Sequence, residues 1–162
     1  MEGIVQDLEL RAPQKPKVRL GRPWIFIAHG GETPARDHLE LFLWRQGYHP
    51  VIVDIMPSLQ MSINDKVDHY LKQCSFAVIF AEADRASTQD GKTHPRLNIV
   101  NEIPRVRNIL GKKFIVLIEK GLSMPSNEND AVHDTFNQDN LERVFLVVQS
   151  EMNAHGITGI SE

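Results

Sequence analysis

The sequence predicts an α/β fold, a three-layer domain around a central parallel sheet of four to five strands. Short apolar runs alternate along the chain with segments whose apolar residues recur at helical spacing. The two clearest runs, Trp24–Ala28 and Phe76–Ala81, are apolar throughout, as in strands that are covered on both faces. A chain of 162 residues also has the length of one domain that can bury its own core.

The folded part is expected to begin just before the first of these runs. Prolines interrupt residues 1–22, which are therefore expected to form an N-terminal tail or linker. Residues 23–158 are expected to form a single domain, and no internal repeat is visible in them.

Composition narrows the classes of function. A net charge of -3 gives no general reason to expect nucleic acid or an anionic membrane as a partner. No apolar run approaches the roughly 20 residues that span a bilayer. Cys74 is the single cysteine, which excludes an internal disulfide and favours a reducing compartment. We therefore expect a cytoplasmic protein.

Capping and stop residues mark the helices. Thr33 is the expected N-cap of a helix with Pro34 at its first position and Gly47 at its end. Ser62 and Asp65 have the spacing of a capping box before a second helix. Further strands are expected at 51–53, 114–118 and, weakly, 132–136, and further helices at 95–110 and from 139 to 156.

Strands that alternate with helices imply right-handed crossovers and a parallel sheet. In a chain of this length the expected strand order is flavodoxin-like rather than a closed barrel. Ligands of such sheets bind outside the carboxyl ends of the strands. The polar segment 82–94 follows a strand and is expected to be a loop, long enough to indicate a function.

Two short motifs are expected at that edge. His29, Gly30 and Gly31 follow the first strand, where the glycines would let the backbone approach a ligand closely. His29 can equally be a structural histidine with satisfied hydrogen bonds. Asp84 and Arg85 follow the third strand, where the alternative is an ordinary solvated acid and base.

The predicted helix 95–110 carries the main candidate for chemistry. Successive helical residues lie about 100° apart, which puts Glu102 about 60° from the centre of the apolar stripe. Glu102 therefore flanks the buried face, and Asn98 lies four residues earlier on the same side. A carboxylate near the ligand edge suits an electrostatic or nucleophilic role. The alternative is a glutamate at a helix border with ordinary solvation.

The order of these motifs resembles the bacterial TIR-like domains that are thought to bind nucleotides, a group that includes the TIR portions of cyclic-nucleotide-activated anti-phage effectors. The segment RLNIVNE at 96–102 is the specific part of the resemblance. IFIAHG at 25–30 and FAVIF at 76–80 are generic for parallel sheets. The remaining matches are GYHPVIV at 47–53 and KGLSMPSN at 120–127, and together the motifs cover about 24–156.

The resemblance implies an NAD+ nucleosidase that releases nicotinamide and either ADP-ribose or a cyclised form, acting in anti-phage defence. In the family the glutamate of this segment is catalytic, and it matches Glu102. The residues that would line the site match His29, Gly30, Gly31, Asp84, Arg96 and Asn98. NAD+ is the substrate, and no cofactor or metal is expected.

The resemblance also implies partners. TIR-like enzymes are often active only when assembled, because a loop of one subunit completes the site of its neighbour. The segment 55–61 is the analogous loop here, so self-association through TIR–TIR contacts is expected. A sensor domain or a separate sensor protein is the other partner that the resemblance implies.

Two departures from the family pattern leave alternatives open. The family usually has an aromatic residue before the glutamate and Leu-Gly after it, whereas this chain has Asn101 before it and Ile103 and Pro104 after it. Pro104 removes a helical hydrogen bond and is expected to kink or restart the helix. A non-catalytic TIR interaction module is therefore one alternative, and a nucleoside deoxyribosyltransferase-like enzyme is another. A receiver-like domain would need an acidic cluster after the first strand, where the chain offers Glu32 alone.

Overall fold

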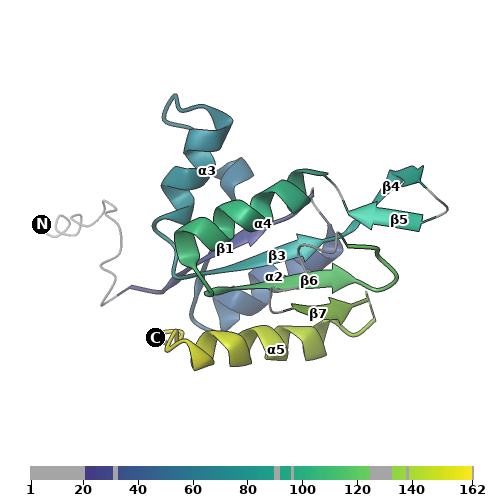
Figure 1. Cartoon of the computed structure of the whole chain (residues 1–162). Helices are drawn as coiled ribbons and strands as arrows, with labels where there is room; N and C mark the ends of the chain where they lie inside the picture. Colours follow the sequence, from purple (N-terminus) through teal and green to yellow (C-terminus); the bar gives the residue numbers. More distant parts are fainter. Residues whose placement is uncertain are drawn as a thin grey trace, which may run out of the picture.

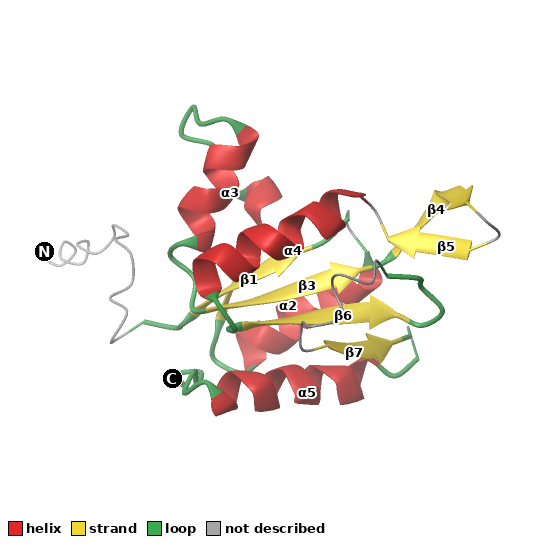
Figure 2. Ribbon diagram, in the orientation of Figure 1, coloured by secondary structure: helices red, strands yellow, loops and turns green. Residues whose placement is uncertain are grey.

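A five-stranded parallel sheet forms the centre of the molecule (Figures 1 and 2). The computed structural model describes residues 21–30, 33–89, 92–95, 97–124, 133–137 and 139–161, and of these it describes 84–89, 92–95, 97 and 98 by their backbone. The strands of the sheet are β1 (Trp24–Ala28), β2 (His49–Val51), β3 (Phe76–Ala81), β6 (Phe114–Glu119) and β7 (His133–Phe136). Their order is β2-β1-β3-β6-β7, and every neighbouring pair is parallel. The predicted flavodoxin-like α/β fold is confirmed.

Helices cover both faces of the sheet (Figure 2). They are α2 (Pro34–Arg45), α3 (Ile63–Leu71), α4 (Leu97–Leu110) and α5 (Leu141–Ala154). Side chains of a strand alternate between faces, so Ile25 and Ile27 pack with α2 and α5 in one core cluster. Phe26 and Ala28 pack with α3 and α4 in the other cluster. The domain therefore has the three layers that the sequence predicts.

The helix signals read from the sequence are largely confirmed. Thr33 caps α2 by accepting a hydrogen bond on its side-chain oxygen from the amide of Arg36 at 3.2 Å. Ser62 caps α3 in the same way from the amide of Asp65 at 3.2 Å. Gly47 follows α2 with a φ of 92°, a left-handed value that suits a glycine.

The last helix starts differently from the prediction. It begins at Leu141, two residues after the predicted start at 139, and the side chain of its N-cap residue Asn140 makes no capping hydrogen bond within the helix. The Asn140 side chain instead accepts a hydrogen bond from the amide of Asn137 at 3.1 Å. The side chains of Asn137 and Asn140 therefore stabilise the turn before α5 instead of capping the helix.

The second strand lies two residues earlier than the predicted range of 51–53. β2 pairs with β1 in the register Trp24 to His49 and Phe26 to Val51. Residues Val53–Ile55 then form a 3-10 helix, η1. Pro50 hid the strand in the sequence, but β2 is an edge strand of the sheet, where a missing amide donor is tolerated.

The segment after β3 is a hairpin rather than the predicted loop. β4 (Ala83–Gln89) and β5 (Lys92–Pro95) form a separate antiparallel sheet, which projects from the body beside α4 (Figure 1). The sequence does contain an indication of this hairpin, because the dipeptide Asp90-Gly91 between the two strands is typical of hairpin turns.

Helix α4 begins at Leu97, two residues later than predicted, because Pro95 is the last residue of β5. It then continues through Pro104 to its end, so the expected restart at this proline is wrong. Pro104 is exposed, which keeps its ring out of the packed face of the helix. The predicted core stripe is confirmed, with Ile99, Ile103 and Val106 buried.

The structure also bears on the single cysteine and on the question of membrane-spanning helices. Cys74 is buried, its thiol donates to the carbonyl of Tyr70 at 3.3 Å, and burial raises the pKa of the thiol. It is therefore a core residue rather than a nucleophile. Across the part of the chain that the structure describes, no helix combines the length and the apolar character that crossing a bilayer requires.

Candidate functional site

A cavity of about 440 Å³ opens at the carboxyl ends of β1 and β2. This is the edge at which ligands of parallel α/β sheets bind. The lining residues come from β1, η1, α3 and α4 together with the residue after β1, and they are Phe26, Ile27, Ala28, His29, Val53, Asp54, Ile63, Lys66, Val67 and Glu102. The cavity therefore brings an apolar floor together with four ionisable side chains.

Glu102 reaches this cavity from the second turn of α4. Ile99 and Ile103 hold the helix against the sheet, so the residue between them is half-buried at the border of the packed face. Its Oε1 atom is buried and has no hydrogen-bond partner among the described residues. A buried carboxylate oxygen without a donor is unusual, because the desolvation is not compensated.

The electrostatic surroundings of Glu102 follow from that burial. Burial raises the pKa of the Glu102 carboxyl above its ordinary value, the positive charge of Arg105 lowers it, and the negative charge of Asp68 raises it. Perturbed carboxyl groups in clefts are frequent at functional sites. The arrangement can present a poorly solvated negative charge to a bound cation.

His29 lies on the same cavity, directly after β1. Its side chain is 5% exposed, and its Nε2 atom lies 4.0 Å from Oδ2 of Asp54, a side chain that is 76% exposed. The histidine is therefore a fixed part of the wall, whereas the carboxylate of Asp54 stands at the mouth. The structure thus brings together two of the residues singled out from the sequence, His29 and Glu102.

The other predicted site residues are not among the described residues that line this cavity. Gly30 follows His29 and is half-buried, but it is not among the residues that line the cavity. Gly31 and Arg96 lie outside the described residues. Asp84 lies at the start of β4 and Asn98 in the first turn of α4, both described by their backbone. Their proposed contacts with a ligand stay predictions.

Sequence reasoning missed Asp54 and Lys66, both of which line the cavity. Asp54 follows an apolar run at the ligand edge, which is a signal that could have found it. Lys66 carried no comparable signal, because its place depends on the angle at which α3 meets the sheet. Ile63 also lines the cavity and is 81% exposed.

Two further carboxylates at the same sheet edge are engaged in structural contacts. Glu82, which follows β3, is 8% exposed, and its Oε1 accepts a hydrogen bond from the Thr33 hydroxyl at 3.4 Å. Glu119 at the end of β6 accepts from the amide of Ala83 at 2.8 Å. Within the described ranges, no three His, Cys, Asp or Glu side chains form a group that could hold a metal ion.

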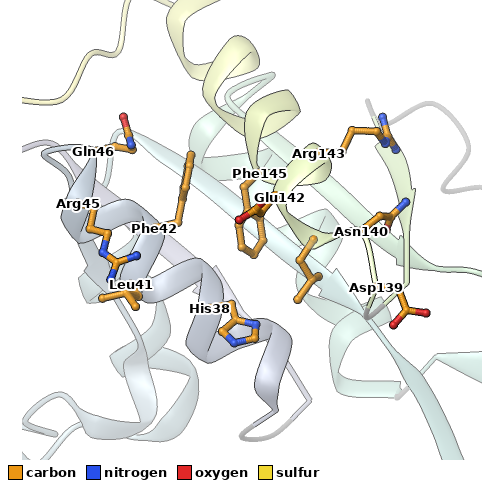
Figure 3. A pocket seen from close by; sticks show the side chains of 11 residues that line it. His38, Leu41, Phe42, Arg45, Gln46, Asp139, Asn140, Glu142, Arg143 and Phe145 are labelled. Carbon is orange, nitrogen blue, oxygen red and sulfur yellow. The ribbon is translucent and has the colours of Figure 1, made fainter.

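A larger cavity of about 640 Å³ lies between α2 and the start of α5 (Figure 3). Its walls carry Phe42 and Phe145, whose ring centroids lie 5.4 Å apart, and the exposed side chain of Leu41. None of the residues that were predicted to act on a ligand lines this cavity.

Comparisons with known proteins agree with this fold. The family model described as "CAP12/Pycsar effector protein, TIR domain" matches residues 24–138, which is more than half of the chain. The chain is similar to Protein tirC of Dictyostelium discoideum, with 25% identity over 118 residues, 68% of this chain and 57% of that protein. The chain thus aligns with little more than half of the length of that relative.

A solved structure with some similarity is the metal-soaked Flv1 flavodiiron core from Synechocystis sp. PCC6803. It matches 83% of this chain and 36% of its own chain, with 10% identity and a TM-score of 0.42.

Proposed function

The chain belongs to the CAP12/Pycsar effector TIR-domain family, and from this premise we propose that it is an NAD+ nucleosidase. It would cleave the bond between nicotinamide and ribose, and release nicotinamide together with ADP-ribose or a cyclised form. Its place would be in anti-phage defence, as the family's effector description suggests.

One observation carries the proposal. The Glu102 carboxyl lines a cavity at the carboxyl ends of the strands, and one of its oxygens is buried without a hydrogen-bond donor. A glutamate at a helix border with ordinary solvation would have both oxygens in water. Glu102 instead has one oxygen that neither water nor a donor among the described residues stabilises, so its carboxylate is poorly solvated at the cavity.

The chemistry of NAD+ explains why one carboxylate can suffice. Most glycosidases need a second carboxyl group that protonates the leaving oxygen. The nicotinamide of NAD+ is already a pyridinium, so it takes the electrons of the glycosidic bond and leaves as a neutral base. The remaining task is to stabilise the positive charge that develops on the ribose, and a fixed charge of this kind contributes about 3 kcal/mol.

Glu102 would either stabilise that cation or attack the anomeric carbon. Water then forms a bond to the anomeric carbon and gives ADP-ribose. If a nucleophilic atom of the same ADP-ribosyl group forms this bond instead, the product is cyclised. Lys66, on the cavity wall, and Arg96 would hold the diphosphate, and His29 would fix the ribose from the wall.

Nicotinamide release tests the proposal. Glu102→Gln, which keeps the size of the side chain, is expected to lower the rate of release from NAD+ by at least about 100-fold. The assay uses high protein concentration, and thermal unfolding of both proteins checks that the fold is retained. Absence of release by the wild-type chain in every assembled state would overturn the proposal.

Self-association is the second part of the proposal. The segment 55–61 carries exposed apolar side chains, Ile55 at 72% and Leu59 at 63%, and it lies close in sequence to Ile63, which lines the cavity. Leu59 and Gln60 adopt left-handed φ values of 51° and 61°, which hold the segment in a conformation that few side chains favour. A neighbouring copy that covers these side chains would also close the mouth of the cavity. A sensor domain or sensor protein would supply the signal for this assembly.

The same exposed apolar side chains favour a second candidate function, a non-catalytic TIR interaction module. The two candidates differ in one result. Glu102→Gln abolishes the biological effect of an enzyme, whereas it leaves the effect of an interaction module intact. Base release from deoxynucleosides, measured in parallel with NAD+, separates both from a nucleoside deoxyribosyltransferase.

A further inference from the structure

An ion pair joins α3 and α4 next to Glu102. Nη1 of Arg105 donates to Oδ1 of Asp68 at 2.8 Å, and Nη2 of the same guanidinium donates to Oδ1 of Asn64 at 3.2 Å. Both acceptors lie on α3. The guanidinium is therefore held by two contacts on the side of the neighbouring helix.

Arg105 lies three residues after Glu102 on the same helix. Residues at this spacing are neighbours on a helix surface, with about 5–6 Å between their Cβ atoms, and a glutamate and an arginine so placed often pair. Yet Arg105 makes its ion pair with Asp68, and Oε1 of Glu102 has no partner among the described residues. Arg105, one of the cations near Glu102, is thus engaged elsewhere.

We propose that Asp68, assisted by Asn64, holds the Arg105 guanidinium away from Glu102 and so keeps an unpaired carboxylate facing the cavity. Asp68 is then a positioning residue that acts through Arg105. The consequence for catalysis rests on the proposed function, because it assumes that this carboxylate stabilises the ribosyl cation. The effect on the carboxyl group itself does not depend on that assumption.

The charges around Glu102 give the direction of the effect. Among the described residues, Arg105 on its own helix and Asp68 on α3 act on its charge, and the ionisable side chains that share its cavity are Lys66 on α3, Asp54 in η1 and His29 after β1. Burial raises the pKa of Glu102, while Arg105 lowers it and Asp68 raises it. Loss of the Asp68 carboxylate removes one raising charge and frees the guanidinium, so both changes lower the pKa of Glu102.

The same loss weakens the proposed catalyst. A guanidinium that pairs with Glu102 offsets the negative charge that the developing cation requires. We expect Asp68→Ala to shift the acid limb of the rate profile to lower pH while the rate on its plateau falls by about tenfold. A residue that merely joined two helices would lower the rate without moving that limb.

Carbon-13 NMR of the side-chain carboxyl groups in the full chain is the first test. The resonance of Glu102 is identified by its loss in Glu102→Gln, and its titration is followed in the wild type, in Asp68→Ala and in Asp68→Ala/Arg105→Gln. We expect the titration midpoint to fall by about one pH unit in Asp68→Ala and to rise to the wild-type value or above it in the double variant, which loses both charges. An unchanged or raised midpoint in Asp68→Ala would overturn the inference.

Nicotinamide release is the second test. The double variant is expected to recover most of the plateau rate that Asp68→Ala loses, because no guanidinium is left to pair with Glu102. Asp134→Ala is the matched control, since it breaks the ion pair between Arg143 and Asp134, 3.2 Å long, on α5 and β7. It is expected to leave the titration and the rate unchanged. If thermal unfolding shows that Asp68→Ala is not folded, Asp68→Asn replaces it.

The two tests separate the inference from the proposed function. A shifted midpoint in a chain that never releases nicotinamide supports the placement of Arg105 and rejects the nucleosidase. A wild-type chain that cleaves NAD+, with a double variant that recovers neither midpoint nor rate, rejects the role of Asp68 and leaves the nucleosidase in place.

Discussion

Glu102 differs from Glu82 and Glu119, two other acidic side chains at the same sheet edge, in what its oxygens contact. The carboxylates of Glu82 and Glu119 accept hydrogen bonds from a hydroxyl and a backbone amide, respectively. Oε1 of Glu102 is buried without such a donor. Glu82 and Glu119 therefore stabilise the starts of α2 and β4. Of the three carboxylates, Glu102 alone is partly buried, lines the cavity and has an oxygen without a hydrogen-bond partner among the described residues.

The raised pKa of Glu102 implies that the rate of the proposed reaction falls at acidic pH. The carboxylate is the reactive form, so the rate of nicotinamide release is expected to rise with pH through a midpoint above the ordinary pKa of glutamic acid. A profile of rate against pH checks this. A rate that is independent of pH from the ordinary range of glutamic acid upward would contradict it.

The same shift has a consequence for stability. A carboxyl whose pKa is raised by folding stabilises the fold while it is protonated, and this contribution is lost as pH rises through the raised value. Glu102→Gln is therefore expected to increase Tm near neutral pH by about 2 °C, since it removes a half-buried charge. Below the ordinary pKa of glutamic acid the two proteins should unfold at the same temperature, which scanning calorimetry at both pH values would measure.

The sequence was sufficient to single out Glu102 because its position depends on local helical periodicity. Ile99 and Ile103 fix the buried face of α4, and the border position between them follows. Asp54 and Lys66 could not be found in this way, since their place on the cavity depends on how η1 and α3 meet the sheet. Helical periodicity in the sequence therefore predicted the position of Glu102. The positions of Asp54 and Lys66 on the cavity became clear only from the tertiary placement of η1 and α3.

At the scale of elements, Thr33 connects the start of α2 to the end of β3. Its hydroxyl oxygen accepts from the amide of Arg36 and its hydroxyl donates to Glu82. Thr33→Ala removes both contacts and is expected to lower the free energy of unfolding by about 1–2 kcal/mol. Thr33→Ser, which keeps the hydroxyl, is the control in denaturant titrations, and equal losses in both variants would show that the hydroxyl contacts contribute little.

Pairing partners explain where the sequence failed to predict elements. The run 51–53 is apolar, but the hydrogen bonds offered by β1 are taken by His49–Val51. The polar segment after β3 has no apolar alternation, and its strands pair with each other instead of with the central sheet. Central strands were predictable because burial on both faces makes them apolar. The bounds of β2 and the presence of the hairpin depend on backbone contacts that composition does not reveal.

At the scale of the whole molecule, the segment before β2 packs tightly against the end of the chain. A Cβ atom added at Gly47 would lie 2.5 Å from the amide nitrogen of Ile160, and that amide donates to the carbonyl of Gly47 at 3.0 Å. Gly47→Ala is therefore expected to lower the free energy of unfolding by at least about 3 kcal/mol.

Gly111→Ala is the matched control for this prediction. Gly111 also has a left-handed φ, 67°, but a Cβ atom there would meet nothing within 4 Å. Its substitution is expected to cost about 1 kcal/mol, from backbone strain alone. Chemical denaturation of both variants measures the difference, and equal costs would show that the contact with Ile160 does not restrict this position.

Assembly is tested at the same scale. Leu59→Asp places a charge on an exposed apolar side chain of the segment 55–61 and is expected to reduce both the mean mass in light scattering at high concentration and the rate of nicotinamide release. Asn153→Asp adds the same charge on an exposed position of α5 and should change neither. An unaltered mass for Leu59→Asp would remove this segment from the proposed interface.

The contact between Ile160 and Gly47 also determines where the carboxyl-terminal end of the described domain lies relative to the cavity. Trp24 and His49 begin their paired strands beside this contact, so both ends of the described domain leave from the amino-terminal rim of the sheet. The Glu102 cleft opens on the opposite rim. A polypeptide joined at either end would therefore leave the described domain on the side away from the proposed active site.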